Sequence, residues 1–421
     1  MESGSPNGPV VLSYENSGGL IAAHVSLPVS KSESNRILMI AAYGGSACNV
    51  QNLSDAHDTV LLHRLLRQIA EGCYEIDCQD AGTVARFLLT YLACREGSWV
   101  LTGNERLRKR PMGDLVDALK QMGASLCCLS HEGFLPIKVD GRRLQGGDVT
   151  LNMERSSQFA SSLLLAAPMF PRGLNLYLGG RLNSLPYIDL TLSLMNRCGA
   201  NVKRNGRDVV VAPKPYSDCL PCASHDWSAA SYWFEMAALA QDCDIVLDSL
   251  SLNSEQGDMV IVEMMRTLGV VARQCEQGVR LRKNDMTQDG LVFDFSNNPD
   301  LFPAVAGTCA GLQKEAKFVG IKNLALKESD RVEALSCELG KIGVVLQKIS
   351  NDVASMTFKS PLPFSTINSP VVFNAHDDHR IAMALAPLTL KLGSVRVDNP
   401  QCVAKSYPSF WMEIGKIFKN S

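Results

Sequence analysis

Four glycines at regular intervals constrain the fold of this chain more than any other feature. Gly123, Gly199, Gly269 and Gly343 each follow an apolar helical pattern and directly precede a β-prone segment. Glycine in this place suits the left-handed residue that ends many helices. The intervals between the four are 76, 70 and 74 residues, and one sixth of the 421 residues is about 70. The spacing therefore predicts a repeated α/β unit, in six copies that form two groups of three.

Individual helices and strands can be placed within this repeat. A helix is expected from Asp58, as its cap, to Gly72, a second helix from Pro111, and a third from Ser329 or Asp330. The buried side of the first helix is expected to carry Val60, Leu61, Leu65, Leu66 and Ile69. Strands are expected at residues 149–151, 209–211, 245–247 and 292–295.

The composition limits the class of protein. With 46% apolar and 20% charged residues, a chain of 421 residues can bury two cores, which favours two domains. The net charge of −2 excludes one global basic field for nucleic acid or a membrane surface. Residues 1–6 lack the basic start and apolar core of a signal peptide, and no uninterrupted apolar run reaches membrane-spanning length. We therefore expect a cytoplasmic protein.

The fourteen cysteines are scattered among apolar runs, which is typical of reduced cysteines and not of a disulfide framework. Cys219 and Cys222 form the one CxxC pair, with His225 close behind. A structural zinc site needs a second ligand pair at matching spacing, and none follows. A metal or redox site at this pair is therefore the less favoured interpretation.

A cluster of cationic and hydroxyl side chains lies at the start of the first apolar helix. Residues 30–36 read Ser-Lys-Ser-Glu-Ser-Asn-Arg. Lysine supplies a point charge, arginine binds two oxygens at once, and serine hydroxyls with free helix amides complete a phosphate cradle. Further cationic clusters follow at residues 106–110, 327–331, 376–380 and 405–408. Any one of them can be solvated surface, but together they predict a site for a highly anionic small molecule.

Several of these features have plainer interpretations. Taken alone, residues 106–110 are a solvated face or a nucleic-acid patch, and the solvated face is favoured because the run lacks the interleaved aromatics that single-stranded nucleic acid needs. Residues 376–379, His-Asp-Asp-His, look like a metal site, but adjacent residues rarely face one ion and Arg380 would repel a cation. Asp300 and Glu328, taken singly, are typical of helix caps or surface carboxylates. We expect no metal and no nucleic-acid partner.

Ten segments, in order, make the chain resemble the 5-enolpyruvylshikimate-3-phosphate (EPSP) synthase family of enolpyruvyl transferases. Beyond the Ser-Lys-Ser-Glu-Ser-Asn-Arg run, they include Asp-Ala-Gly-Thr at residues 80–83 and Lys-Glu-Ser-Asp-Arg at residues 327–331. The full set is residues 27–36, 80–86, 110–113, 156–159, 184–189, 226–232, 299–300, 327–331, 378–380 and 405–408. One such segment is weak, but ten in the family's order across most of the chain are specific.

This resemblance implies an α/β fold of two similar domains, each of three repeated β-α-β-α-β-β units around a pseudo-threefold axis, with the active site in the interdomain cleft. One domain is expected to comprise residues 29–225 and to carry the cradle for shikimate 3-phosphate. The other is expected to comprise residues 1–28 plus 226–421. Its implied site residues are Asp300, Glu328, Arg331, Arg380 and Lys405. The sixfold spacing of the glycines agrees with this fold.

The resemblance also implies a reaction. The enolpyruvyl group of phosphoenolpyruvate passes to the 5-hydroxyl of shikimate 3-phosphate by addition and elimination through a tetrahedral intermediate, a step of chorismate and aromatic amino acid biosynthesis. Asp300 is implied as the general base, Glu328 as the acid that protonates the methylene group, and Lys31 as a further catalytic residue. No cofactor or metal is implied. We expect a monomer that acts on two small molecules and has no membrane partner.

Binding residues follow from the same resemblance, position by position. Those implied to bind shikimate 3-phosphate are Lys31, Ser32, Arg36, Ser156, Ser157, Gln158, Ser184, Tyr187, Asp300, Asn323 and Lys327. Those implied to bind phosphoenolpyruvate are Lys31, Asp80, Gly82, Arg110, Gln158, Arg331, Arg380 and Lys405. In this family glyphosate competes with phosphoenolpyruvate. Because Gly82 has no Cβ and leaves room for the longer inhibitor, we expect a sensitive enzyme.

Three residues depart from the family pattern. Val29 stands where glycine is usual, and Asp80 and Asp377 stand where asparagine is usual. An ionised Asp80 would repel phosphoenolpyruvate, so we expect it to turn away and pair with Arg106 or Arg110. The two aspartates leave open a noncatalytic ligand-binding homologue.

A second alternative is a UDP-N-acetylglucosamine enolpyruvyl transferase, which shares the fold. That enzyme uses a loop cysteine and lacks the Ser-Lys-Ser-x-Ser-Asn-Arg signature. The corresponding loop here, residues 101–111, contains no cysteine. The shikimate enzyme is therefore the favoured interpretation.

Overall fold

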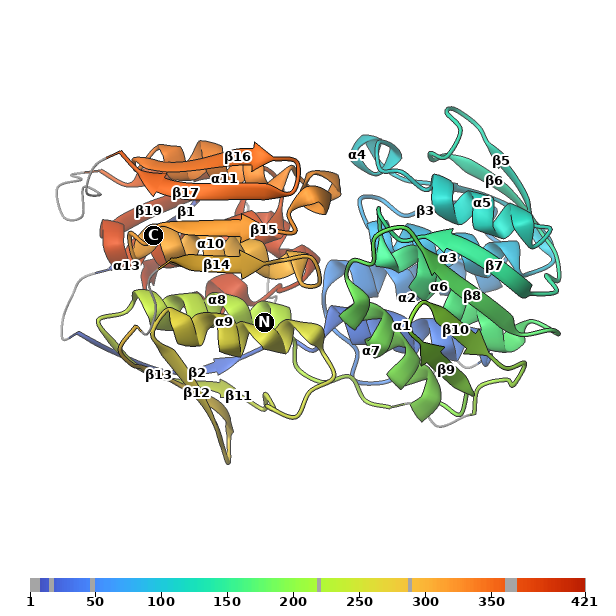
Figure 1. Ribbon diagram of the computed structural model, residues 1–421, viewed down its shortest axis with the longest axis horizontal. Coiled ribbons are helices and arrows are strands. Elements are labelled where there is room, and N and C mark those ends of the chain that lie inside the picture. The colour runs from blue at the N-terminus through green and yellow to red at the C-terminus, as the bar shows by residue number, and fades with distance from the viewer. Residues whose placement is uncertain are drawn as a thin grey trace. The chain divides into compact units, whose positions relative to one another are not determined.

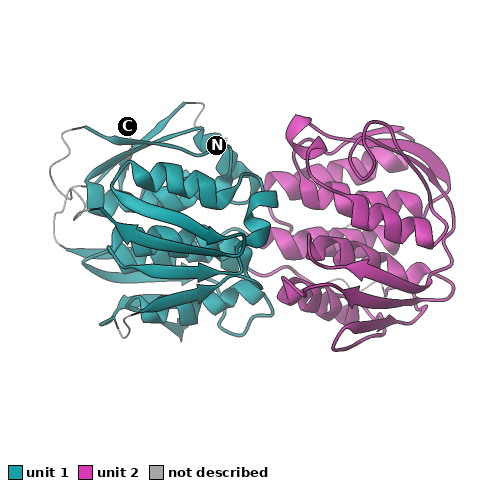
Figure 2. Ribbon diagram, turned by 45° about the horizontal axis from the view of Figure 1, so that its top comes forward, with its two compact units in different colours: residues 1–28, 225–421 teal, residues 29–224 magenta. Residues whose placement is uncertain are grey.

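The computed structural model describes residues 8–14, 19–45, 50–217, 221–286, 290–359 and 369–420. The chain forms two compact units (Figure 2). Unit 1 comprises residues 1–28 and 225–421, and unit 2 comprises residues 29–224. Residues 1–6 and Cys219 of the CxxC pair lie outside the described residues.

Five four-stranded sheets, among the residues just given, repeat one pattern of strand pairing (Figure 1). In each sheet an outer strand pairs in parallel with its neighbour, and the other two ladders are antiparallel. In residues 291–358, for example, β14 leads through α10 to β15 and then through α11 to the antiparallel pair β16 and β17. The expected β-α-β-α-β-β unit is thus confirmed in five copies among the described residues, and the sixth copy, in unit 2, stays a prediction.

Unit 1 contains three of these sheets. Their strand orders are β18-β19-β1-β20, β12-β13-β11-β2 and β14-β15-β17-β16. The strands are β1 (Val10–Ser13), β2 (Leu20–Ser26), β11 (Asp242–Asp248), β12 (Val270–Cys275), β13 (Gly278–Lys283), β14 (Leu291–Asp294), β15 (Ala316–Val319), β16 (Val344–Ser350), β17 (Val353–Phe358), β18 (Val371–Asn374), β19 (Ser394–Asp398) and β20 (Lys419–Asn420). The α-helices are α8 (Trp227–Leu239), α9 (Ile261–Thr267), α10 (Phe302–Gly311), α11 (Arg331–Gly340), α12 (His379–Leu385), α13 (Thr389–Leu392) and α14 (Phe410–Ile414).

Unit 2 contains the other two sheets, with strand orders β3-β4-β6-β5 and β7-β8-β10-β9. The strands are β3 (Glu75–Asp77), β4 (Gly97–Thr102), β5 (Ser125–Cys128), β6 (Ile137–Gly141), β7 (Gly147–Asn152), β8 (Leu174–Gly179), β9 (Val202–Asn205) and β10 (Asp208–Val211). The α-helices are α1 (Lys31–Tyr43), α2 (His57–Ala70), α3 (Gly82–Ala93), α4 (Glu105–Arg108), α5 (Gly113–Gln121), α6 (Ser157–Ala166) and α7 (Leu185–Arg197). Across the described ranges of both units, no helix is both long and apolar enough to cross a membrane.

Three mutually packed helices lie in the core of each unit: α1, α3 and α6 in unit 2, and α8, α10 and α12 in unit 1. Every residue of α10 is buried, and so is every residue of α8 except Ser228. A helix that is apolar on all sides can only be stable inside a core. The first residues of these helices include Lys31, Gly82 and Ser157, which the sequence assigns to the site.

The four spacing glycines all adopt the left-handed conformation that the sequence predicts. Their φ angles are 90° at Gly123, 85° at Gly199, 84° at Gly269 and 87° at Gly343. Each stands between a helix and the next strand. A side chain at such a position would be strained, which explains why glycine marks the repeat.

Two of the expected helix starts are wrong, and one is confirmed. Asp330 caps α11 by accepting a hydrogen bond from the backbone N–H of Glu333 at 3.2 Å. Asp58 does not cap α2, which begins at His57, because its carboxylate binds Lys31 instead. Val60 is 55% exposed, since it lies off the face that carries the buried leucines. The helix expected from Pro111 begins two residues later, at Gly113.

The expected strands lie within or across observed ones. Residues 149–151, 209–211 and 245–247 fall inside β7, β10 and β11. The fourth, residues 292–295, overlaps β14, which ends one residue earlier at Asp294. The Asp294 side chain accepts a hydrogen bond from the backbone N–H of Ser296 at 2.8 Å, and this turn ends the strand.

One carboxylic acid lies inside the core of unit 1. Glu235 of α8 is 0% exposed, and neither carboxyl oxygen has a hydrogen-bond partner among the described residues. One of these oxygens lies directly against Gly307 of α10. Burial raises the pKa of Glu235 well above its usual value and so favours the neutral form.

Candidate functional site

In unit 1, charged side chains gather around Arg331, the first residue of α11. Its Nη1 lies 2.8 Å from Oδ1 of Asp300, and its Nη2 lies 3.0 Å from Oε2 of Glu328. Its Nε lies 2.9 Å from Oδ2 of Asp378. The Arg331 side chain is only 1% exposed, so these three carboxylates neutralise a buried cation. Asp378 is buried as well and caps α12.

Asp300, in the 3₁₀ turn Pro299–Leu301, joins cations from three elements. Besides its contact with Arg331, its Oδ1 lies 3.3 Å from Nζ of Lys327, and its Oδ2 lies 2.8 Å from Nη2 of Arg380. Burial alone would raise the pKa of Asp300, but Arg380, Lys327 and Arg331 outweigh it and hold the pKa well below 3.8. Asp300 is therefore ionised in the ligand-free arrangement.

Lys327 and Glu328 complete the group, directly before α11. Burial lowers the pKa of Lys327, although the charge of Asp300 opposes this shift. Two carboxylates, Asp300 and Glu328, thus share one buried arginine but differ in their other contacts. Such a pair can take different protonation states, which acid and base catalysis require.

The remaining predicted residues of unit 1 lie on neighbouring elements. Lys405 is 6% exposed and ends a 3₁₀ helix, Pro400–Lys405, that packs against α12. Arg380 is the second residue of α12, and its Nη1 lies 3.5 Å from the hydroxyl of Tyr232 in α8. Asn323 is half-buried in a 3₁₀ helix, Lys322–Leu326. The sequence assigned no role to Tyr232.

In unit 2, Lys31 is the first residue of α1. Its Nζ lies 3.3 Å from Oδ2 of Asp58, which is 2% exposed. Ligand atoms of His57, Asp58 and Asp80 all lie within 4.8 Å of one another. Asp80 therefore lies in a small acidic group close to Lys31. Its pairing with an arginine of residues 106–110 stays a prediction.

Arg36, one turn further along α1, is 3% exposed and donates four hydrogen bonds. It donates to Oγ1 of Thr191 at 2.8 Å and to the carbonyl oxygen of Ser32 at 2.8 Å. It also donates to Oγ of Ser161 at 3.3 Å and to the carbonyl oxygen of Tyr187 at 3.2 Å. Burial lowers its pKa to about 10, so it stays protonated at neutral pH. These bonds fix α1 against α6 and α7 and position Ser32 and Tyr187.

Three predicted phosphoenolpyruvate residues come together around Arg86 of α3. A Cβ at Gly82 would lie 2.6 Å from Nη1 of Arg110 and 2.8 Å from Nη1 of Arg86. Arg86 donates to Oε1 of Gln158 at 2.6 Å, and its guanidinium lies 5.4 Å from the ring centre of Phe159. The absence of a Cβ at Gly82 lets both guanidinium groups approach the backbone.

The predicted serines lie at the starts of α6 and α7, which pack against each other. Ser156 caps α6, and its Oγ accepts from the backbone N–H of Gln158 at 3.2 Å. Ser157 follows as the first residue of the helix and is 8% exposed. Ser184 adopts a left-handed φ of 57° directly before α7, and Tyr187 lies in its first turn. Free helix N–H groups and hydroxyls at these ends suit a phosphate.

Three charged residues of these groups received no role from the sequence. Asp378 binds Arg331, Asp58 binds Lys31, and Arg86 binds Gln158. Asp378 and Arg86 stand inside two of the ten segments that resemble the family, and this position could have marked them as site residues. Asp58 was taken for a helix cap, and only the structure shows its carboxylate beside Lys31.

The two histidines of residues 376–379 have different partners. His379 is 1% exposed, and its Nδ1 lies 3.7 Å from Oδ1 of Asp378. His376 instead lies 2.8 Å from a carboxyl oxygen of Glu338 in α11. The motif therefore places its two imidazoles beside different carboxylates.

Comparison with known protein families identifies the relatives of this chain. Residues 60–414 match the family model for EPSP synthase (3-phosphoshikimate 1-carboxyvinyltransferase). A 3-phosphoshikimate 1-carboxyvinyltransferase of Bacteroides fragilis is 40% identical over 398 residues, which cover 94% of this chain and 95% of that protein. A 3-phosphoshikimate 1-carboxyvinyltransferase of Methanospirillum hungatei is 30% identical over 429 residues, which cover 96% of this chain and 97% of that protein.

Solved structures share the fold at lower sequence identity. An EPSP synthase from Acinetobacter baumannii superposes with a TM-score of 0.74 at 20% identity, and the match covers 98% of this chain and 100% of that one. The enolpyruvyl transferase NikO from Streptomyces tendae gives a TM-score of 0.69 at 14% identity and covers 99% of each chain. At these identities the likeness supports the fold.

Proposed function

Since the chain belongs to the EPSP synthase family, we propose that it transfers the enolpyruvyl group of phosphoenolpyruvate to the 5-hydroxyl of shikimate 3-phosphate and releases phosphate. The two substrates carry two phosphates and two carboxylates. So much negative charge is stable in one site only opposite several arginines and lysines. Both units supply such side chains.

The observation that carries the proposal is the ion-pair network of Asp300, Glu328 and Arg331 in unit 1. It combines buried cations, which bind anions, with two carboxylates that can move protons. A purely binding homologue needs the cations but has no need of both carboxylates. The network therefore favours an enzyme over a ligand-binding protein.

Substrate binding would also change the basicity of Asp300. With Arg380, Lys327 and Arg331 around it, its pKa is too low for an effective general base. The anionic groups of phosphoenolpyruvate compete for Arg331 and Arg380 and add negative charge nearby. Both effects raise the pKa of Asp300 toward the range in which it accepts a proton. The base thus becomes effective only when substrate is present.

In unit 2, we assign the shikimate 3-phosphate cradle to the ends of α1, α6 and α7. Lys31 and the hydroxyls of Ser156, Ser157 and Ser184 hold the phosphate. Ser32, Gln158 and Tyr187 contact the ring and carboxylate. Arg36 orients two of these residues through its bonds to the backbone of Ser32 and Tyr187, and Asn323 and Lys327 add contacts from unit 1.

Phosphoenolpyruvate is held, in this proposal, by residues of both units. Lys31, Arg110, Gln158 and the backbone at Gly82 come from unit 2, with Asp80 nearby. Arg331, Arg380 and Lys405 come from unit 1. Planar guanidinium groups bind carboxylate and phosphate oxygens in pairs, which suits arginine for most of these positions.

The reaction then proceeds in two stages. Asp300 accepts the proton of the 5-hydroxyl group while the hydroxyl oxygen bonds to C2 of phosphoenolpyruvate. In the same stage, Glu328 protonates the methylene carbon. The C–O bond of the tetrahedral intermediate then breaks, and the departing phosphate takes up the proton held by Asp300, while Glu328 removes a proton from the methyl group and restores the double bond. The transferred atoms and protons balance without a metal or cofactor.

The test is release of phosphate from phosphoenolpyruvate. The proposed enzyme releases phosphate only when shikimate 3-phosphate is added. Release that needs UDP-N-acetylglucosamine instead would identify the related transferase, and the absence of release with tight binding of shikimate 3-phosphate would identify a noncatalytic homologue.

We further propose that the enzyme works as a monomer in the cytoplasm. None of the twelve cysteines among the described residues is in a disulfide, which suits a reducing compartment. Sedimentation velocity with and without substrates tests the monomer. A stable dimer at the concentrations of the assay would contradict it.

A further inference from the structure

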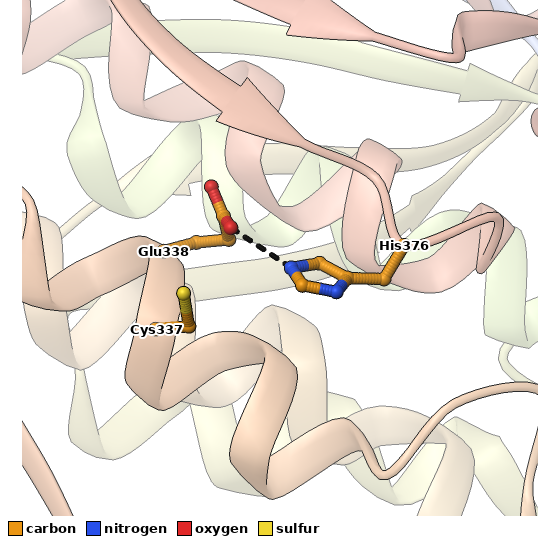
Figure 3. Close-up of side chains that lie close together, drawn as sticks. All are labelled: Cys337, Glu338 and His376. Atoms are coloured by element: carbon orange, nitrogen blue, oxygen red, sulfur yellow. Dashed lines mark hydrogen bonds and ion pairs between the residues drawn. The ribbon is translucent and has the colours of Figure 1, made fainter.

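Three side chains with different ligand atoms lie together in unit 1, away from the network around Asp300. The thiol of Cys337, the carboxylate of Glu338 and the imidazole of His376 have ligand atoms within 4.8 Å of one another. Figure 3 shows Cys337 and Glu338 coming from the same turn of α11 and the ring of His376 facing Glu338. His376 lies in the turn between β18 and α12.

We propose that Cys337, Glu338 and His376 form a binding site for a thiophilic divalent cation, Zn²⁺. Sulfur, imidazole nitrogen and carboxylate oxygen are the ligands that zinc prefers, and three protein ligands with one water complete a tetrahedron. Ligand atoms around tetrahedral zinc lie roughly 3.3–3.7 Å apart. The triad reaches this spacing when Nε2 of His376 and Oε1 of Glu338, which lie 2.8 Å apart, separate around the metal and the exposed Cys337 turns toward them.

Glu338 is already oriented as a ligand. Its Oε2 accepts hydrogen bonds from Nζ of Lys341 at 2.6 Å and from the backbone N–H of Asn374 at 2.8 Å. Its Oε1 faces His376 Nε2 at 2.8 Å and is the oxygen available to a metal. Hydrogen bonds to the second oxygen of a ligating carboxylate are common around metal centres and fix its direction.

The charge state of the triad also suits a cation. The Glu338 side chain is only 2% exposed, and its Oε2 forms an ion pair with Nζ of Lys341 at 2.6 Å, so a carboxylate oxygen faces the triad. Lys341 is the one nearby cation among the described partners of Glu338, and its side chain is 40% exposed. It can therefore stay on Oε2 or swing into solvent when a metal binds Oε1.

The metal site would connect α11 with the turn before α12, and both of these elements carry residues of the proposed active site. Cys337 and Glu338 stand in the helix that begins with Arg331, and His376 stands two residues before Asp378, the cap of α12. His376 and Asp377 both have left-handed φ angles, 52° and 50°. A metal would hold this turn at a second point, in addition to the pair between Arg331 and Asp378. The site was not predicted from the sequence, because the residues at 376–379 were compared only with one another and not with the side chains of α11.

Titration with Co²⁺, which replaces Zn²⁺ and absorbs light, tests the proposal independently of activity. The protein should bind one Co²⁺ with a thiolate-to-metal charge-transfer band, and Zn²⁺ should abolish the band. Cys337→Ser should lose the band, and His376→Asn, which tolerates the left-handed backbone, should bind at least about tenfold more weakly. The controls Cys127→Ser and Cys222→Ser alter other exposed cysteines and should keep the band.

A second measurement needs no variant. Zn²⁺ should slow alkylation of Cys337 by iodoacetamide and leave the rate at Cys127 unchanged, as read by mass spectrometry of the peptides. A band that persists in Cys337→Ser, a band lost in Cys222→Ser, or equal alkylation with and without Zn²⁺ would overturn the proposal. None of these outcomes bears on phosphate release, so the proposed function stands or falls separately.

Discussion

The two units hold their buried arginines by different means. In unit 1, Arg331 binds the carboxylates of Asp300, Glu328 and Asp378. In unit 2, the hydrogen bonds of Arg36 go to hydroxyl and carbonyl oxygens of neutral groups. Both guanidinium groups are nearly inaccessible to solvent. The difference lies in the charge of the partners.

The charge of the partners decides which of two functions a buried arginine can serve, proton transfer or anion binding. Carboxylate partners cancel the charge of a buried arginine and also provide groups that accept and donate protons. Neutral partners satisfy the donors of Arg36 but leave its positive charge uncancelled, which draws an anion toward unit 2. We infer that unit 1 is built for proton transfer and unit 2 for holding an anion. The following variants test this contrast, in order of expected effect.

The largest effect is expected from the carboxylates of unit 1. Asp300→Asn and Glu328→Gln should each lower kcat by on the order of 10²–10⁴, the usual loss when an acid or base is removed. Binding of shikimate 3-phosphate should change by less than about tenfold, because the cradle that we propose for it lies mainly in unit 2. Steady-state kinetics and calorimetry measure the two effects. Glu333→Gln, at an exposed position of α11, is the matched control. Near-parental kcat in either variant would remove that residue from the mechanism.

The next effect is on stability. Arg331→Met removes the buried cation that three carboxylates share and should destabilise unit 1 by about 3–5 kcal/mol, although Asp300 keeps Lys327 and Arg380. Arg36→Met leaves only neutral oxygens unpaired and should destabilise unit 2 by about 1–3 kcal/mol. Hydrogen exchange, read separately on peptides of each unit, measures both. Equal losses in the two units would show that the charge of the partners does not matter.

The same contrast predicts a dependence on pH. The pKa of Asp300 in the folded chain lies below 3.8, so its ion pairs contribute full stability above about pH 5 and lose it as the pH falls toward the folded pKa. The difference in urea midpoint between the parent and Asp300→Asn should therefore be constant from about pH 7 to 5 and shrink below that. A difference that stays constant down to acid unfolding would mean that the low pKa is wrong.

Gly82→Ala should perturb the anion site of unit 2 without affecting proton transfer. The new Cβ would displace the guanidinium groups of Arg110 and Arg86. We expect the KM for phosphoenolpyruvate to rise by roughly tenfold, with kcat nearly unchanged, since one charged contact weakens. The inhibition constant for glyphosate should rise more, because the longer inhibitor needs the same space. Gly340→Ala, where a Cβ meets no neighbour, is the control. A fall in kcat as large as the rise in KM would contradict this division.

The smallest effect is expected at Asp80. It lies with His57 and Asp58 close to Lys31. Asp80→Asn removes one negative charge from this group and should lower the KM for phosphoenolpyruvate by roughly threefold or less, the size of one weak hydrogen bond. Kinetics across pH measure the change. A gain of tenfold or more, concentrated at high pH, would instead place the Asp80 carboxylate against the substrate.

The repeat and the family could be predicted from the sequence because both rest on local patterns. The glycines after α5, α7, α9 and α11 mark the repeat, since a left-handed residue is a property of the backbone alone. Resemblance over ten segments then supplied the fold and the reaction. Burial of α8 and α10 on all sides was not readable from periodicity, because a helix without a polar face shows no period.

Contacts between distant segments could not be predicted from the residues. Asp58 resembled a helix cap because a capping aspartate and a buried partner of Lys31 look alike in sequence. Three of the four neutral partners of Arg36 come from α6 and α7, more than 120 residues away. Cys337 and Glu338 stand 38 or more residues before His376, so no spacing rule joins them. Each of these contacts depends on how the helices pack.

Glu235 and Gly307 restrict the order in which this core can evolve. A methyl group at position 307 would collide with the Glu235 carboxyl group and approach the carbonyl oxygen of Ala384 to 2.9 Å. A lineage that gains alanine at 307 first passes through a strained intermediate. A lineage that first replaces Glu235 by a smaller apolar residue removes a buried acid and opens the space that the methyl group needs. The two substitutions reach the same end state, but only the second path avoids the collision with the Glu235 carboxyl group, and the close approach to the carbonyl oxygen of Ala384 is common to both.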